Sequence, residues 1–253
     1  MFRRAAAFFL TAALITTGSH GAGTLKKELS IVLVHGAFVD GSGWKALYDS
    51  LEKDGYEVIV VQNSTATFDG DVATTERAIA SAKYPVVLVG HSYAGSIITE
   101  AGNDPKVRSL VYVAAFAPDA GESTKTLIDQ PVPGAAPVPL LPPQDGFLMV
   151  DPAKFPHAFA ADVDTETTRF MAVSQVPWGL AAVEGKVKTA AWKNKPSHFL
   201  ITTEDLMIPT PAQRSMANRI GAKVKEIKSS HAVMLSHPAD VERFIIDASK
   251  ASL

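Results

Sequence analysis

The fold of this chain is decided by the stretch Val86-Val87-Leu88-Val89-Gly90-His91-Ser92-Tyr93-Ala94-Gly95-Ser96-Ile97-Ile98. An apolar run ends in a small residue, a serine follows between bulky neighbours, and a segment of helical character begins. This order is typical of a nucleophile elbow, in which a serine lies on a tight turn between a strand and a helix. The positions two before and two after the serine must be small, and they are Gly90 and Ala94. Glycine is usual at the second position; here Gly95, one residue later, can relieve crowding between helix and strand.

An elbow serine needs partners because its hydroxyl is a weak nucleophile at neutral pH. A base must take the proton of Ser92, and fixed N–H donors must stabilise the charge that develops on an attacked carbonyl. The free N–H groups at the start of the next helix point toward that charge. The elbow therefore predicts a histidine, a carboxylate and two amide donors elsewhere in the chain.

Length and composition limit the classes of function. The chain has 253 residues, 47% hydrophobic and 20% charged, which fits one large domain or one domain with an insertion. The net charge of −2 comes without a basic cluster, so neither nucleic acid nor a membrane surface is an expected partner. The chain has no cysteine, which excludes disulfides, a thiol nucleophile and a cysteine-ligated metal. We expect no metal and no cofactor, and the oligomeric state stays open.

The first 21 residues have the pattern of a secretory signal peptide. Arg3 and Arg4 precede an apolar run from Ala5 to Thr17, and small residues follow, with Ser19 and Gly21 at the positions that suit cleavage. A retained membrane anchor is the alternative, but the run is shorter than the roughly 20 residues a membrane span needs. We expect residues 1–21 to be removed and the protein to be exported, to the periplasm or the medium.

Apolar segments alternate with amphipathic ones along most of the chain, which predicts an α/β fold with a mostly parallel sheet flanked by helices on both faces. The expected strands are 31–35, 56–62, 85–90, 107–114, 197–202 and 222–227. The expected helices are 43–54, 71–83, 93–103, 211–220 and 238–251.

The alternation breaks between the strands 107–114 and 197–202. Residues 131–143 hold six prolines, too many for a regular element, and helix-like pieces such as 165–174 follow. Aromatic and aliphatic residues in this region need burial, which argues against a long disordered loop. We interpret 118–196 as an inserted cap over a core formed by 22–117 and 197–253.

The expected base is His231. On this kind of sheet the partners follow the serine in the order acid, then histidine, each after a late strand. His231 follows the last strand by a short polar loop, whereas His237 opens the last helix and suits a cap position better. The expected acid is Asp205, directly after the strand 197–202, with Glu204 as the alternative. Such a carboxylate fixes the histidine tautomer.

The oxyanion donors are expected at two places. One is the backbone N–H of Tyr93, directly after the serine. The other comes from the loop after the first strand, where Ala37 is preferred and Phe38 is second. For substrate binding, Phe38, Trp178 and Met207 are candidates to line an apolar pocket, although each could equally belong to the core.

Taken together, these residues resemble the α/β-hydrolase superfamily over nearly all of 29–253. The match rests on His35-Gly36, Gly90-His91-Ser92-Tyr93, Asp205 and His231, and it is most similar to small serine esterases related to plant methylesterases and hydroxynitrile lyases. Haloalkane dehalogenases and epoxide hydrolases carry an aspartate at the elbow, in place of Ser92. The related lyases carry a threonine after the strand-end histidine and a lysine after the catalytic histidine, where this chain has Gly36 and Ala232. The resemblance therefore implies a hydrolase.

Three functions follow in order of expectation. The first is hydrolysis of a small-molecule carboxylic ester through an acyl-enzyme. The second keeps the same triad but acts on a lactone, on a C–C bond beside a ketone, or with peroxide as acceptor. The third is a binding protein without turnover, which the complete set of Ser92, Asp205 and His231 disfavours.

Overall fold

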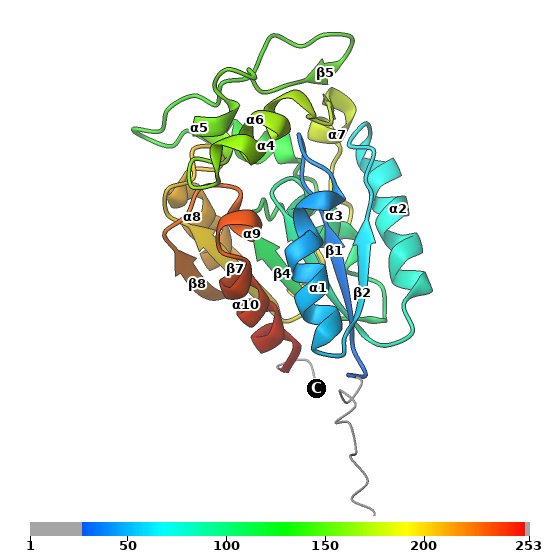
Figure 1. The fold of residues 1–253 in the computed structure, drawn as a ribbon. Helices are drawn as coiled ribbons and strands as arrows, with labels where there is room; N and C mark the ends of the chain where they lie inside the picture. Colours follow the sequence, from blue (N-terminus) through cyan, green and yellow to red (C-terminus); the bar gives the residue numbers. More distant parts are fainter. Residues whose placement is uncertain (1–26, 251–253) are drawn as a thin grey trace, which may run out of the picture.

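The computed structural model describes residues 27–250, so the expected signal peptide lies outside the described part of the chain. Six strands form a wholly parallel sheet in the order β2-β1-β3-β4-β7-β8 (Figure 1). The strand order changes direction after β2, because β3 pairs with β1 and not with β2, and helices connect the parallel neighbours. The strands are β1 (Ser30–Val34), β2 (Glu57–Val61), β3 (Val86–His91), β4 (Val107–Val113), β7 (Ser197–Thr202) and β8 (Lys223–Ile227).

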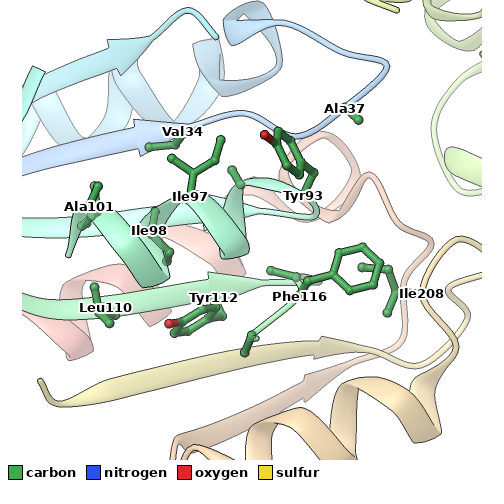
Figure 2. Packing of buried hydrophobic residues seen from close by; sticks show 14 of the residues in the cluster. Val34, Ala37, Tyr93, Ile97, Ile98, Ala101, Leu110, Tyr112, Phe116 and Ile208 are labelled. Carbon is green, nitrogen blue, oxygen red and sulfur yellow. The ribbon is translucent and has the colours of Figure 1, made fainter. Parts of the chain in front are cut away.

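Helices cover both faces of this sheet, and each face has its own apolar core. On one face, α1 (Lys45–Lys53) and α10 (Pro238–Lys250) pack against Ile31, Leu33, Val87 and Val89. The other face carries α2 (Phe68–Ser81), α3 (Ala94–Ala101) and α8 (Thr210–Arg219). Figure 2 shows the second core, where residues from α3 lie over side chains of β1 and β4. Burial on both faces explains why these strands are continuously apolar.

All the expected strands and helices of the core are present, with bounds that differ by a few residues. The largest difference is at α2, which begins at Phe68 rather than at Asp71, because the Thr67 side chain accepts a hydrogen bond from Gly70 N and caps the helix there. The expected helix 43–54 is a 3₁₀ turn, η1 (Gly41–Trp44), followed by α1. The predicted α/β-hydrolase architecture is confirmed.

Between β4 and β7 the chain forms a group of short elements at one end of the sheet, drawn at the top of Figure 1. Residues 131–143 form no helix or strand, as their prolines predict. The elements are α4 (Thr124–Ile128), β5 (Phe147–Leu148), α5 (Phe155–Phe159), α6 (Thr165–Val173), β6 (Trp178–Gly179), α7 (Leu180–Glu184) and the 3₁₀ turn η2 (Ala191–Lys193). Strands β5 and β6 pair antiparallel. Outside this segment, the short helix α9 (Val233–Ser236) follows β8.

Within residues 27–250, no helix combines the length and the apolar character that a membrane crossing needs.

Candidate active site

Ser92 lies on a strained turn between β3 and α3. Its φ angle is +58°, in the left-handed region that a residue with a side chain enters only at a cost of about 1–3 kcal/mol. Three backbone hydrogen bonds hold it there: Ser92 N donates to Val113 O, and Ser92 O accepts from Gly95 N and Phe116 N, at 3.2, 3.0 and 3.1 Å. The neighbouring strand thus fixes the turn that lifts the hydroxyl out of the sheet.

The crowding expected around the elbow is present. A Cβ atom on Gly90 would lie 2.7 Å from Ala94 O, and one on Gly95 would lie 2.0 Å from Phe116 O. The closer approach is therefore at Gly95, whereas the methyl group of Ala94 fits into the core. This explains how the elbow forms with alanine two residues after the serine.

Ser92, His231 and Asp205 are joined by two hydrogen bonds. His231 Nε2 lies 2.8 Å from Ser92 Oγ, and His231 Nδ1 lies 2.7 Å from Asp205 Oδ2. All three side chains are buried, with Ser92 the most exposed at 8%. Because an ionised carboxylate only accepts, Nδ1 carries the proton and Nε2 accepts from the serine. The structure thus brings together the three residues that the sequence singled out, in a geometry suited to proton transfer.

Asp205 is held by more donors than the histidine alone. Its Oδ1 accepts from Met207 N and Ile208 N at 2.8 and 2.9 Å, and its Oδ2 also accepts from Thr202 Oγ1 and Gln213 Nε2 at 2.8 and 2.9 Å. These bonds fix the rotation of the carboxylate. No sequence pattern points to Gln213, which comes from α8.

The alternative acid and the alternative histidine lie elsewhere. The Glu204 side chain is 54% exposed and faces Lys228 at 3.4 Å. His237 follows α9 and is one-third exposed, with its Nδ1 2.9 Å from Ser236 Oγ. Neither of them belongs to the hydrogen-bond chain of Ser92.

His91, the last residue of β3, supports the histidine loop. Its Nε2 donates to His231 O at 3.0 Å, and the two rings lie 4.6 Å apart. Burial lowers the pKa of His91 well below its usual value, and the neighbouring His231 lowers it further. The ring therefore stays neutral and donates a fixed hydrogen bond, which keeps a second positive charge away from His231.

The segment between β4 and β7 also contacts the histidine loop, and no sequence pattern predicts this contact. Phe159 packs edge-on against the His231 ring at 4.8 Å, and its carbonyl accepts from Ala232 N at 3.0 Å. Asp162 accepts hydrogen bonds from the amide and the hydroxyl of Ser230. The pKa of Asp162 lies below its usual value, since these hydrogen bonds outweigh its burial.

The two expected oxyanion donors come from two different parts of the chain. Tyr93 precedes α3 and Ala37 lies on the loop after β1, as Figure 2 shows. Within the described residues, neither amide N–H has a hydrogen-bond acceptor. Both amides are thus free to donate, as is that of Phe38, whose φ angle of +65° marks a sharp turn in the same loop.

A cavity of about 440 Å³ opens beside Ser92. Phe38, Trp178 and Met207, the three expected pocket residues, all line it, and so does Ala37. The Tyr93 side chain does not; it is buried behind Trp178, with ring centroids 5.2 Å apart. The remaining wall is mostly apolar and includes Phe116, Leu127, Pro131, Val132, Pro137 and Ile208.

No group of three His, Cys, Asp or Glu side chains between residues 27 and 250 is arranged to hold a metal ion.

A family model described as the alpha/beta hydrolase family matches residues 31–244. The chain belongs to the alpha/beta hydrolase family. This alpha/beta hydrolase is 35% identical over 118 residues to the carbendazim hydrolyzing esterase of Nocardioides sp. (strain SG-4G), a match that spans 41% of the chain and about half, 49%, of that relative.

Two solved structures extend the likeness over the whole fold. Polyneuridine aldehyde esterase superposes with a TM-score of 0.74 at 23% identity, covering 88% of this alpha/beta hydrolase and 100% of that chain. The methylesterase MES16 from Arabidopsis gives 0.73 at 20% identity, covering 88% and 99%. These two likenesses show that the chain shares the fold of both proteins.

Proposed function

We propose that this alpha/beta hydrolase is a serine esterase that cleaves small carboxylic esters through an acyl-enzyme. The observation that carries the proposal is the buried hydrogen-bond chain from Ser92 Oγ through His231 to Asp205, at 2.8 and 2.7 Å. This arrangement meets the geometric requirement for nucleophilic catalysis, in which a base contacts the nucleophile and a third group orients the base.

In the first half of the reaction, Ser92 Oγ attacks the ester carbonyl carbon while His231 Nε2 takes its proton. The tetrahedral intermediate places its negative oxygen between the amides of Tyr93 and Ala37. It collapses when His231 returns the proton to the departing alcohol, which leaves an acyl group on Ser92. Water then attacks the acyl carbon while His231 Nε2 takes one of its protons. The bond from this carbon to Ser92 Oγ breaks, His231 gives the proton to Ser92 Oγ, and the carboxylic acid leaves. Asp205 remains ionised throughout and stabilises the protonated His231.

The cavity supports a largely apolar substrate without a negative charge, since Asp129 is among the described residues that line it. About 440 Å³ accommodates a small ester, and neither lysine nor arginine is among the described residues that line the cavity. Phe38, Trp178 and Met207 are the proposed substrate contacts. Residues 118–196 would serve as the cap, because they supply Trp178 and much of the proline-rich wall.

Gly36 favours hydrolysis over the lyase reaction of related proteins. A Cβ atom at this position would lie 2.7 Å from Ser92 Cβ and 2.9 Å from His91 O. A threonine, which the lyases carry there, would collide with the nucleophile unless the backbone moved.

We also propose, from the sequence, that the protein is exported after cleavage of residues 1–21.

The test is turnover of p-nitrophenyl acetate by the wild-type protein and by Ser92→Ala. We expect the variant to lose about three or more orders of magnitude in rate. Activity retained by a folded Ser92→Ala protein would overturn the proposal. Parallel assays on a lactone of similar size separate an esterase from a lactonase, since both reactions use the same triad.

A further inference from the structure

A buried carboxylate outside the triad lies beneath the site. Asp71, in the first turn of α2, is fully buried, and none of the ion pairs within residues 27–250 involves it. Its Oδ2 accepts a hydrogen bond from Tyr93 Oη at 3.0 Å, and its Oδ1 accepts from Thr65 N and Ser64 Oγ at 3.0 and 3.1 Å. Burying an ionisable group without a cation is costly, so these contacts need an explanation beyond packing.

We infer that Asp71 is a positioning residue that fixes the oxyanion donors through the Tyr93 hydroxyl and through the loop at Thr65. This inference rests on the proposed function and extends it to the part of the protein that holds the amides in place. Two connections lead from Asp71 toward the site.

The first connection runs through aromatic rings. The ring of Tyr93, whose own backbone N–H is one proposed donor, packs on Trp178 with centroids 5.2 Å apart. Trp178 in turn packs edge-on against Phe38 at 5.6 Å. Phe38 follows Ala37, the other proposed donor. The three rings therefore link the two sides of the oxyanion site, and the bond from Tyr93 to Asp71 anchors one end of the row.

The second connection runs through the backbone. Thr65, whose amide donates to Asp71, has a φ angle of +53°. Its hydroxyl donates to Pro177 O at 2.7 Å and its carbonyl accepts from Gly179 N at 2.9 Å. Trp178 is thus held on both sides by one residue that Asp71 orients. Asp71 therefore fixes the position of the Trp178 ring and of β6, the strand that carries Trp178.

The protonation of the pair is consistent with this role. Burial raises the pKa of Tyr93 well above its usual value, and the neighbouring Asp71 raises it further, so the hydroxyl keeps its proton and donates. Burial also raises the pKa of Asp71, and the hydrogen bonds from Tyr93, Ser64 and Thr65 oppose that rise because they stabilise the carboxylate.

The test compares Tyr93→Phe with Tyr112→Phe. Both changes remove a buried tyrosine hydroxyl and keep the ring; Tyr112 Oη bonds Thr99 Oγ1 at 2.9 Å in the same core and does not line the cavity. For each variant, kcat and KM are measured with p-nitrophenyl esters. The inhibition constant of a trifluoromethyl ketone, whose adduct with a serine carries an oxyanion, is measured beside that of the product acid.

For Tyr93→Phe we expect kcat to fall by at least about tenfold and the affinity for the ketone to fall by a similar factor, because a displaced oxyanion donor weakens binding of the transition state. KM and the affinity for the product acid should change by less than about twofold, since they report ground-state binding. Tyr112→Phe should leave all four values within about twofold of wild type.

Asp71→Asn supplies a second, isosteric variant. Combined with Tyr93→Phe, it should cost less than the product of the two single effects, because both changes break the same bond. If Tyr93→Phe and Asp71→Asn match Tyr112→Phe, or if the two changes combine without coupling, the inference is wrong. That outcome differs from failure of the proposed function, in which Ser92→Ala would keep the wild-type rate.

Discussion

Replacing Asp205 by asparagine tests the proposed role of the carboxylate, because the structure dictates how the new amide must lie. Met207 N and Ile208 N both donate to Oδ1, so the amide oxygen takes that position. The NH₂ group then occupies the position of Oδ2. There it faces His231 Nδ1 at 2.7 Å and Gln213 Nε2 at 2.9 Å, both of which donate in the wild-type protein.

Two consequences follow from a donor that faces donors. His231 must move its proton to Nε2 in order to accept from the amide, and Nε2 then cannot accept the proton of Ser92. The rate should fall by about three to four orders of magnitude, as the loss of the correct tautomer does in serine hydrolases. Gln213 Nε2 loses its bond to Asp205 but keeps Ile208 O and Thr202 Oγ1 as acceptors at 2.8 and 3.1 Å, so the free energy of unfolding should fall by about 0.5–1.5 kcal/mol.

The assay is kcat/KM for p-nitrophenyl acetate together with urea unfolding followed by fluorescence. Glu204→Gln is the matched control, because it makes the same chemical change one residue away on a side chain that is 54% exposed. It should change the rate by less than about twofold and stability by less than about 0.5 kcal/mol. A rate within tenfold of wild type for a folded Asp205→Asn protein, or a larger loss in Glu204→Gln, would show that Asp205 does not set the tautomer of His231.

Two further predictions concern the elbow and the buried histidines. Gly95→Ala should lower the free energy of unfolding by about 1–3 kcal/mol and reduce turnover, because the new methyl group meets Phe116 O at 2.0 Å. Ala94→Gly should cost only about 1 kcal/mol in urea unfolding. Equal effects of the two changes would show that Gly95 is not the more crowded position. Burial lowers the pKa of His198 and lowers that of His91 further, well below its usual value, so below about pH 6.5 the unfolded chain binds more protons at these two residues than the folded protein does. Between pH 6.5 and 5 the free energy of unfolding should therefore fall with falling pH, by at most about 1.4 kcal/mol per pH unit for each histidine. If His198→Gln shows the same dependence of unfolding free energy on pH as the wild type, His198 does not contribute to it.

The sequence was sufficient for the sheet and for the three residues of the hydrogen-bond chain. Strands buried on both faces are continuously apolar, and glycine and proline mark the ends of the helices between them, so local patterns define the core. Ser92, Asp205 and His231 each follow a strand directly or by a short loop. In a parallel sheet the ends of those strands lie together, which makes their proximity predictable from chain order.

The rest of the site depends on contacts that leave no local pattern. In the sequence, Asp71 is an ordinary acidic residue near the start of a helix, and only the fold shows that it accepts a hydrogen bond from the Tyr93 hydroxyl. The same holds for Phe159 and Asp162, which reach the histidine loop from a segment about 70 residues earlier in the chain. Sequence reasoning also could not predict that Pro131 and Pro137 line the cavity, because an irregular segment has no periodicity from which its buried side can be inferred.

Covalent labelling with a fluorophosphonate tests most directly whether Ser92 is the nucleophile, because the reactive serine oxygen bonds to phosphorus and fluoride leaves. Intact-protein mass spectrometry followed by peptide mapping identifies the site and the stoichiometry. If Ser92 is the nucleophile, we expect one phosphonyl group per chain, located on the peptide that contains Ser92 and absent in Ser92→Ala. A wild-type protein that stays unlabelled while folded, or a label on a different serine, would contradict it.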